Sequence, residues 1–364
     1  MLSRLAENLY WMGRYIERAE NTARLLDVNY HAIVEAPHLF RGVLTEQWAP
    51  LLSITGDAES FKKHFERADR NTVPEWLSRH PENSSSISAS LTHARENART
   101  LRDRISTEMW SSLNRSYLAL CAEPSEEETS LHDFCEGVRD ASALFFGLAE
   151  ATMPHDLGWL FLRSGRHLER ADNVLRILQV RYRQYRGQEP VARAIETHRA
   201  TALLKSCSAF EAFRKGHHSA LEPDRIAAFL LLDAGFPRSL RYSVRRLFES
   251  LDGINKQNPG VSEEPLRQAG WLNAQLTYME SAEQILKREE PSLEALLGAL
   301  AKISDATRRA YFDNAPELPR PVQSQWQQGV GQALVQGQGQ TQGRGRGQSQ
   351  SQRQSQGWSR DQNS

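Results

Sequence analysis

A sequence motif that occurs twice restricts how this chain can fold. The first copy covers residues 13–26 (GRYIERAENTARLL) and the second covers residues 165–178 (GRHLERADNVLRIL). The second copy begins 152 positions after the first (165 − 13), and it keeps Gly, Arg, Glu-Arg-Ala, Asn, Arg and Leu at the same places. A duplication of this kind predicts two structural repeats that pack against each other, residues 1–150 and residues 151–315.

The first copy lies in a stretch with the spacing of an amphipathic helix. Apolar residues recur every three or four positions, and no proline occurs from Met1 to Ala36, so one helix of about 30 residues and about 45 Å is allowed. Residues three or four positions apart are neighbours on a helix surface, so a polar stripe runs beside the apolar one, with Arg18 pointing further round. The apolar stripe comprises Leu2, Leu5, Leu9, Met12, Ile16, Ala19, Ala23 and Leu26, and the polar stripe comprises Tyr10, Gly13, Arg14, Glu17, Asn21 and Arg24.

The second copy keeps the polar stripe as well as the motif. Gly165, Arg166, Glu169, Asn173 and Arg176 take the places of five stripe residues. A solvated helix face is free to exchange such groups for other polar residues. Their retention predicts that something touches this stripe in both halves.

The remaining chain shows helical patterns and no strand or hairpin signal, so we predict an all-α fold, a multi-helix bundle built from two internal repeats. After residue 315 the composition changes to Gln, Gly, Ser and Arg, which predicts a disordered C-terminal tail over residues 316–364. The further predicted helices cover residues 44–54, 57–68, 74–80, 87–121, a segment opening at 124, and then 157–186, 191–215, 223–233, 237–254, 263–289 and 292–313.

Composition excludes several classes of protein. The chain has 45 basic and 45 acidic residues, so no overall field favours nucleic acid or an anionic membrane. The longest apolar runs are far shorter than the ~20 residues of a membrane span. The three cysteines form no C-x-x-C pair, which argues against a zinc site or a disulfide framework and favours a reducing compartment. The Arg-Gly segment at 344–347 is similar to RNA-binding tails, although a solvated tail is the favoured interpretation.

The opening stretch, Ser3-Arg4 followed by residues 10–21 (YWMGRYIERAEN), resembles the bacterial alpha-E domain family, whose hallmark is a Glu-Arg motif. Residues 95–99, 165–172 and 229–239 resemble the same family, and the resemblance extends to about residue 312. It implies a cytoplasmic helical protein that is encoded beside, or fused to, a circularly permuted ATP-grasp amidoligase. Transglutaminase-like proteases are implied as further neighbours. This context implies a role in peptide synthesis or modification, and it assigns no catalytic residue.

The two Glu-Arg stripes are the first candidate site. Glu17 and Glu169 are expected to face each other across a pseudo-twofold axis. One interpretation is a network of ion pairs that sets the helix register. The other is a binding site for a peptide terminus, an amino acid or a nucleotide group, because arginine binds carboxylates and phosphates through two parallel hydrogen bonds. The candidate ligand-binding residues are Arg14, Glu17, Arg18, Asn21, Arg166, Glu169, Arg170 and Asn173.

Metal binding is a third interpretation of the same motif. Glu17 with Glu20, and Glu169 with Asp172, place two carboxylates near one helix face in each repeat. Neither motif contains the Glu-x-x-His pair of di-iron bundles, and the adjacent arginines would repel a cation. His217-His218 is a weak signal, since adjacent side chains on a helix diverge. We therefore predict no metal and no cofactor.

The second candidate site is the segment 236–241 (FPRSLR). With Pro237 at the first helical position, free N–H groups beside Arg238 and Ser239 would form an anion pocket. An ordinary helix start is the alternative. The aligned segment of the first repeat, residues 83–87, has no arginine at the corresponding place, so such a pocket would belong to one half only.

No recognisable nucleophile, phosphate loop or Cys/His arrangement occurs. The favoured hypothesis is a non-catalytic helical partner that holds or presents a substrate to an ATP-grasp amidoligase. The alternative is an enzyme that acts on a peptide or acyl intermediate, with Glu17 or Glu169 as acid or base. That alternative requires a carboxyl group whose pKa is shifted toward neutrality.

Overall fold

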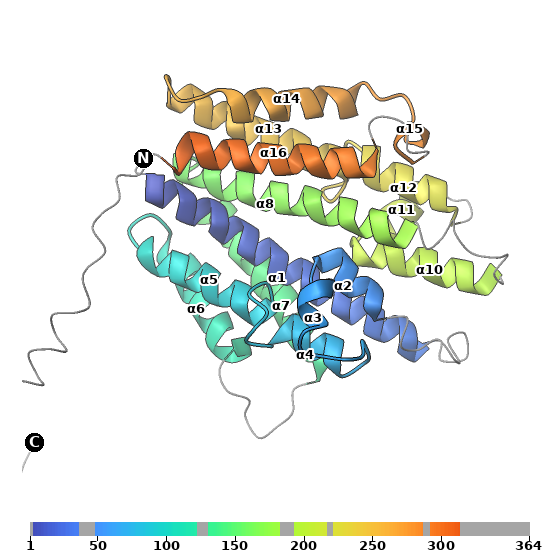
Figure 1. The fold of residues 1–364 in the computed structure, drawn as a ribbon. Coiled ribbons are helices and arrows are strands. Elements are labelled where there is room, and N and C mark those ends of the chain that lie inside the picture. Colours follow the sequence, from blue (N-terminus) through green and yellow to red (C-terminus); the bar gives the residue numbers. More distant parts are fainter. Residues whose placement is uncertain are drawn as a thin grey trace, which may run out of the picture. The chain divides into compact units, whose positions relative to one another are not determined.

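Two helices carry the duplicated motif and lie against each other at the centre of the fold: α1 (Ser3–Glu35) and α8 (Leu157–Ile177). Figure 1 shows them side by side in this computed structural model. The structure describes residues 3–35, 48–121, 130–182, 193–216, 221–286 and 292–313. Within these ranges all regular structure is helical and no strand occurs, which confirms the predicted all-α fold.

The first half of the chain surrounds α1. Helix α1 packs against α5 and α7, and α6 packs against both of these helices. The short helices α2 and α4 contact α1, and α4 also contacts α5 (Figure 1). The elements are α2 (Ala49–Thr55), α3 (Ala58–Phe61), α4 (Thr72–Ser78), α5 (Ile87–Thr100), α6 (Thr107–Cys121) and α7 (Leu131–Thr152).

The second half surrounds α8 in the same manner. Helix α8 packs against α13 and α16, and α14 packs against both of these helices. This shared neighbour pattern supports the interpretation of two repeats, which stays a prediction. The elements are the π-helical turn η3 (Leu178–Tyr182), α10 (Arg193–Ser206), α11 (Phe210–Gly216), α12 (Pro223–Leu232), α13 (Leu240–Gln257), α14 (Glu264–Thr277), α15 (Glu283–Leu286) and α16 (Leu293–Tyr311).

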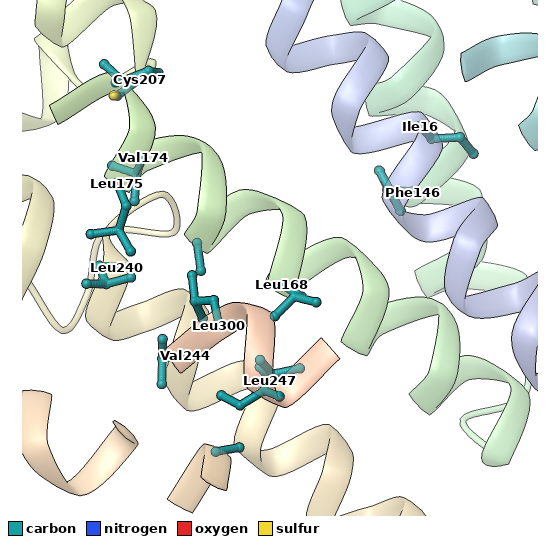
Figure 2. Close-up of a cluster of buried hydrophobic side chains, with 14 of the residues drawn as sticks. Ile16, Phe146, Leu168, Val174, Leu175, Cys207, Leu240, Val244, Leu247 and Leu300 are labelled. Carbon is teal, nitrogen blue, oxygen red and sulfur yellow. The ribbon is translucent and has the colours of Figure 1, made fainter. Parts of the chain in front are cut away.

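The main hydrophobic core is continuous across both halves, from Ala6 on α1 to Phe312 just after α16. Figure 2 shows its α8 side, where apolar side chains of α8, α13 and α16 meet. Removal of these side chains from water is the main favourable contribution to folding. The labelled residues in this part are Leu168, Val174 and Leu175 on α8, Leu240, Val244 and Leu247 on α13, and Leu300 on α16.

The apolar stripe predicted for α1 is buried. Leu9, Met12 and Ile16 belong to the main core, whereas Ala19 and Ala23 belong to a smaller cluster that includes side chains of α2, α4, α5 and α7. Leu26 also lies in the smaller cluster, Leu5 is partly buried, and Leu2 lies outside the described residues. One helix therefore contributes to two clusters, because its stripe is longer than any single partner helix.

Several predicted helices are wrong in length. The predicted helix 87–121 is two helices, because Ser106 begins a new one: its Oγ accepts a hydrogen bond from the N–H of Met109 at 3.1 Å. The predicted helix 191–215 breaks near Ser208, whose φ is +52°. The predicted helices 263–289 and 57–68 are also interrupted, since α14 ends at Thr277 and α3 has four residues. None of these breaks contains proline or glycine, so the sequence carries little signal for them.

Other predictions fall on undescribed parts of the chain. The predicted turn at 37–42, the helix start at Pro124, His217-His218 and the predicted tail 316–364 lie outside the described residues. Among the described residues, no helix is both long enough and apolar enough to cross a membrane.

Candidate functional site

Two glycines allow α1 and α8 to approach closely. A Cβ atom on Gly13 would overlap the carbonyl oxygen of Leu162, and a Cβ atom on Gly165 would overlap the carbonyl oxygen of Tyr10. These contacts are reciprocal, because Leu162 follows Tyr10 by the same 152 positions (162 − 10) that separate the two glycines. The close crossing brings the charged residues of the next turn within reach of the opposite helix.

Glu169 on α8 is bound by two arginines of α1. Arg14 donates from Nε to Oε2 at 2.7 Å. Arg18 donates from Nε to Oε1 at 2.7 Å and from Nη2 to Oε2 at 3.1 Å. Arg18 is expected to point further round the helix than the polar stripe, yet its long side chain reaches Glu169 on the opposite helix.

Glu17 on α1 is bound in the same way by two arginines of α8. Arg170 donates from Nε to Oε1 at 2.7 Å and from Nη2 to Oε2 at 2.8 Å. Arg166 donates from Nε to Oε2 at 3.4 Å. The glutamate of each motif thus binds arginines of the other motif, and the two helices form a reciprocal ion-pair network. That Glu17 and Glu169 face each other at one shared locus stays a prediction.

The arginines keep both carboxyl groups ionised. Burial alone would raise the pKa of Glu169, but the charges of Arg18 and Arg14 outweigh it and lower the pKa to about 2. Burial also opposes ionisation of Glu17, and the charges of Arg170 and Arg238 lower its pKa well below the usual range. Burial and the neighbouring Arg170 lower the pKa of Arg166 to about 10.

Arg238 is the third arginine that binds Glu17. It lies in the segment that immediately precedes α13. It donates from Nη1 to Asn21 Oδ1 at 3.0 Å and to Glu17 Oε1 at 3.4 Å. Its Nη2 lies 2.9 Å from Oε2 of Glu20, and Arg24 binds Oε1 of the same carboxylate. The guanidinium of Arg238 therefore bridges two carboxylates and an amide.

The predicted helix start at Pro237 is wrong. Helix α13 begins at Leu240, and Ser239 is its N-cap, with Oγ accepting from the N–H of Tyr242 at 3.0 Å. The Ser239 hydroxyl also donates to the carbonyl oxygen of Asp233 at 2.5 Å. The proline lies outside the helix because Ser239 provides the stronger cap. Both side chains predicted to bind an anion, Arg238 and Ser239, instead bind groups of the protein.

A pocket of about 370 Å³ opens beside Glu169, between α1, α8 and α16. Half of the ten predicted site residues line it, and the others lie in the network around Glu17 or at the start of α13. Its lining also includes Asp172, Arg176, Ser85, Ser304 and Asp305, which the sequence did not single out as ligand-binding residues. The predicted residues that line it are Arg14, Arg18, Asn21, Glu169 and Asn173.

A second polar cluster lies where α1 meets α7. Nδ1 of His132 lies 2.7 Å from Asp27 Oδ1, and Nε2 of His31 lies 3.1 Å from Nδ1 of His132. These three residues are placed to hold a metal ion, although Arg139 already pairs with the second oxygen of Asp27 at 3.1 Å. The four-residue spacing of Asp27 and His31 is the one signal in the sequence that points to this cluster.

The cysteines that the structure describes are structural. Cys135 and Cys207 are buried and unpaired. Burial raises the pKa of each thiol to about 12, so neither forms a thiolate at neutral pH. The side chain of Cys121 lies outside the described residues.

The fold and the network define a class of protein. It is a helical bundle in which the glutamate on each of two central helices binds arginines of the other helix. The chain belongs to the Alpha-E family, described as a predicted alpha-helical domain with a conserved ER motif, and the match covers residues 1–312. Similar proteins include uncharacterised proteins of Mycobacterium bovis and Mycobacterium tuberculosis, each 29% identical over 338 residues. The similarity covers 86% of this chain but 36% of the length of those relatives. No solved structure matches the chain.

Proposed function

We propose that this chain is a non-catalytic helical partner of a circularly permuted ATP-grasp amidoligase, and that it holds or presents a substrate for peptide synthesis or modification. The observation that supports this proposal most directly is the state of the two motif glutamates. Both carboxylate oxygens of Glu17, and both of Glu169, accept a hydrogen bond from an arginine of the opposite helix. The motif thereby acts as a structural clamp beside the pocket.

The lowered pKa values weigh against the enzymatic alternative. A general acid must carry a proton at neutral pH, and a general base needs a pKa close to neutrality. The pKa of Glu169 is about 2, and the charges of Arg170 and Arg238 lower the pKa of Glu17 well below its usual range. Neither carboxyl group therefore has the proton affinity that acid–base catalysis requires.

The comparison of lengths also supports a role within a larger system. The chain spans 36% of the length of its mycobacterial relatives, so in those proteins the Alpha-E region is accompanied by other segments. The resemblance to the family implies an ATP-grasp ligase as the partner, a transglutaminase-like protease as a second one, and a cytoplasmic location. We assign the chemistry to the ligase and the binding of a substrate to this chain.

Coexpression with a circularly permuted ATP-grasp ligase tests the proposal. We expect the two proteins to elute together in size-exclusion chromatography and the ligase activity to fall when this chain is omitted. An ATP-grasp ligase of ordinary, unpermuted domain order serves as the control and should not associate. Separate elution together with unchanged ligase activity would contradict the proposal.

The enzymatic alternative is tested on the same substrate with the isolated chain. Turnover by the chain alone, abolished in both Glu17→Gln and Glu169→Gln variants that remain folded, would replace the accessory role with catalysis. We expect no turnover from the chain alone.

A further inference from the structure

The pocket beside Glu169 has a counterpart in the other half of the molecule. There, the side chain of Arg238 fills the corresponding place. In that half, Arg238 contacts Glu17, Glu20 and Asn21. The residues 152 positions later are Glu169, Asp172 and Asn173, and all three line the pocket. Every side chain that binds the guanidinium of Arg238 therefore has its counterpart in the pocket wall.

The counterpart of Arg238 itself is Ser85. Arg238 immediately precedes Ser239, the N-cap of α13, and Ser85 immediately precedes Ser86, the N-cap of α5, whose Oγ accepts from the N–H of Ala89 at 3.2 Å. Ser85 also lines the pocket. A serine side chain is too short to reach the two acidic residues, and the space that an arginine would fill stays open.

The carboxylate oxygens show the same difference. Glu20 uses Oε1 for Arg24 and Oε2 for Arg238. Its counterpart Asp172 pairs through Oδ2 with Arg176 at 2.5 Å, and among the described residues it pairs with no second arginine. Asp172 thus lacks the second cation that its counterpart Glu20 binds.

The charges near the pocket favour a cation more than those around Arg238 do. Two carboxylates (Glu17 and Glu20) and three other arginines surround Arg238, yet it stays buried and charged. The pocket wall contains three acidic residues (Glu169, Asp172 and Asp305) and three arginines. A guanidinium in the pocket would therefore meet as many arginines as Arg238 meets in its own place, and one more carboxylate.

A buried donor also lines the pocket. Asn21 is 4% exposed, and its amide nitrogen makes no hydrogen bond in the structure, whereas its amide oxygen accepts from Arg238. A buried amide N–H without a partner costs about 1–3 kcal/mol. A ligand with an oxygen acceptor near its cation would satisfy this group.

We propose that the pocket binds a guanidinium group, carried by an arginine residue of a peptide or by free arginine, in the place that Arg238 occupies in the other half. Glu169, Asp172 and Asn173 hold the guanidinium, and Asn21 faces the acceptor part of the ligand. The inference rests on the proposed function insofar as this pocket is the site that holds the substrate, and it specifies the chemical class of that substrate.

Calorimetric titration of the full chain tests the inference. The probes are N-acetyl-arginine amide, which represents a peptide residue, free arginine, and the citrulline derivative, which has the same shape without the charge. We expect saturable binding of at least one arginine compound, and at least tenfold weaker binding of the citrulline compound. The stronger of the two arginine compounds identifies the source of the group.

Two variants locate the binding in the pocket. Ser85→Arg supplies the missing guanidinium from the protein, so we expect it to remain folded and to abolish binding. Asp172→Asn removes one charge and should weaken binding at least tenfold. Asp252→Asn is the matched control, since Asp252 also pairs with a residue four positions later but lies on α13 and does not line the pocket; it should bind like the wild type.

Equal affinity for the arginine and citrulline compounds would overturn the inference, and so would unchanged binding in folded Ser85→Arg. Absence of binding at millimolar concentration, or preferential binding of acetate or phosphate, would overturn it as well. The titration needs no ligase, so its failure leaves the accessory role standing. Conversely, a chain that binds arginine but never associates with a ligase would retain the pocket assignment and lose the accessory role.

Discussion

The Glu-Arg pair at the centre of the motif works between helices. Adjacent positions on a helix diverge by about 100°, so Arg18 cannot bind Glu17, and it reaches Glu169 on the opposite helix. Aromatic rings cover the hydrophobic side of these arginines: the guanidinium of Arg14 lies 4.9 Å from the ring of Trp11, and that of Arg166 lies 3.8 Å from the ring of Phe146. The network is therefore partly shielded from water, and each of its buried charges depends on a partner.

Glu17→Gln should destabilise the protein strongly. The Glu17 side chain is 1% exposed and neutralises Arg170, Arg166 and Arg238. Loss of its charge leaves the buried Arg170 without its carboxylate, and breaking a buried pair in this manner costs about 3–5 kcal/mol. Urea unfolding followed by circular dichroism measures the change.

Asp252→Asn is the control for that measurement, because Asp252 pairs with the exposed Lys256 on the surface of α13. We expect its urea midpoint to match that of the wild type. If Glu17→Gln has the same midpoint as this control, the network does not contribute to stability.

Stability should fall in acid because of Glu169. Its pKa is about 2 in the folded protein, whereas a glutamate without these neighbours has a pKa of about 4.5, so the unfolded chain binds the proton more readily. The contribution of this group, on the order of 3 kcal/mol, is complete above about pH 5 and is lost as the pH falls toward 2. Urea unfolding at pH 6, 4 and 3 measures this loss.

The Glu169→Gln variant isolates the group, because glutamine does not titrate. We expect the free energy of unfolding of this variant to depend less on pH between 5 and 3 than that of the wild type. Equal pH dependence in the two proteins would assign the acid sensitivity to other carboxyl groups.

At the scale of elements, the crossing of α1 and α8 decides which charges meet. The two glycines allow backbone contact, and the reciprocal overlaps with Leu162 and Tyr10 show that there is no room for a side chain. Small residues at such crossings let two helices approach more closely than the usual 8–10 Å. The network is a consequence of that approach.

Gly13→Ala should therefore destabilise the protein, although alanine favours a helix more than glycine does. The new methyl group meets backbone atoms, so the helices must move apart, at a cost of about 1–3 kcal/mol. Gly147→Ala on α7 is the matched control, because no atom lies within 4 Å of the added Cβ. We expect this control to gain about 0.5–1 kcal/mol.

Thermal unfolding of the two variants, followed by circular dichroism, compares them. A Gly13→Ala protein with a melting temperature at or above that of Gly147→Ala would mean that the α1–α8 crossing adjusts without cost.

At the scale of the whole molecule, the main core joins the two halves. It includes side chains from Ala6 to Phe312, and the contact between α1 and α8 is the most extensive between two helices in the described part of the chain. The main core is complete in neither half, and the smaller cluster of the first half shares α1 with it. We therefore expect the helices within residues 3–313 to unfold in one cooperative transition.

Urea unfolding with two probes tests this expectation. Tryptophan fluorescence reports on the surroundings of the eight tryptophans, Trp48 and Trp76 of the smaller cluster among them, whereas far-ultraviolet circular dichroism reports on all helices. We expect the two curves to coincide and to shift together in Glu17→Gln, as for a single cooperative unit. Two separate transitions would indicate that the halves are independent domains.

The sequence predicted the local features of this site well. The period of three to four residues identified α1 and its buried stripe, and the repeat at 152 positions identified the residues that α1 and α8 exchange. These features depend on spacing along one helix, which the order of residues records directly. Helix breaks without proline or glycine, such as those at Ser106 and Ser208, left little trace in the pattern.

Duplication of the motif and the all-helical class were thus determined by the order of residues alone. The tertiary structure decided which charges pair, that Arg238 joins Glu17 from 221 positions away, and that Ser85 leaves the matching place open. The physical reason is that these outcomes depend on the distance and angle at which helices cross. Side chains far apart in the sequence meet there, and a periodic pattern contains no information about such meetings.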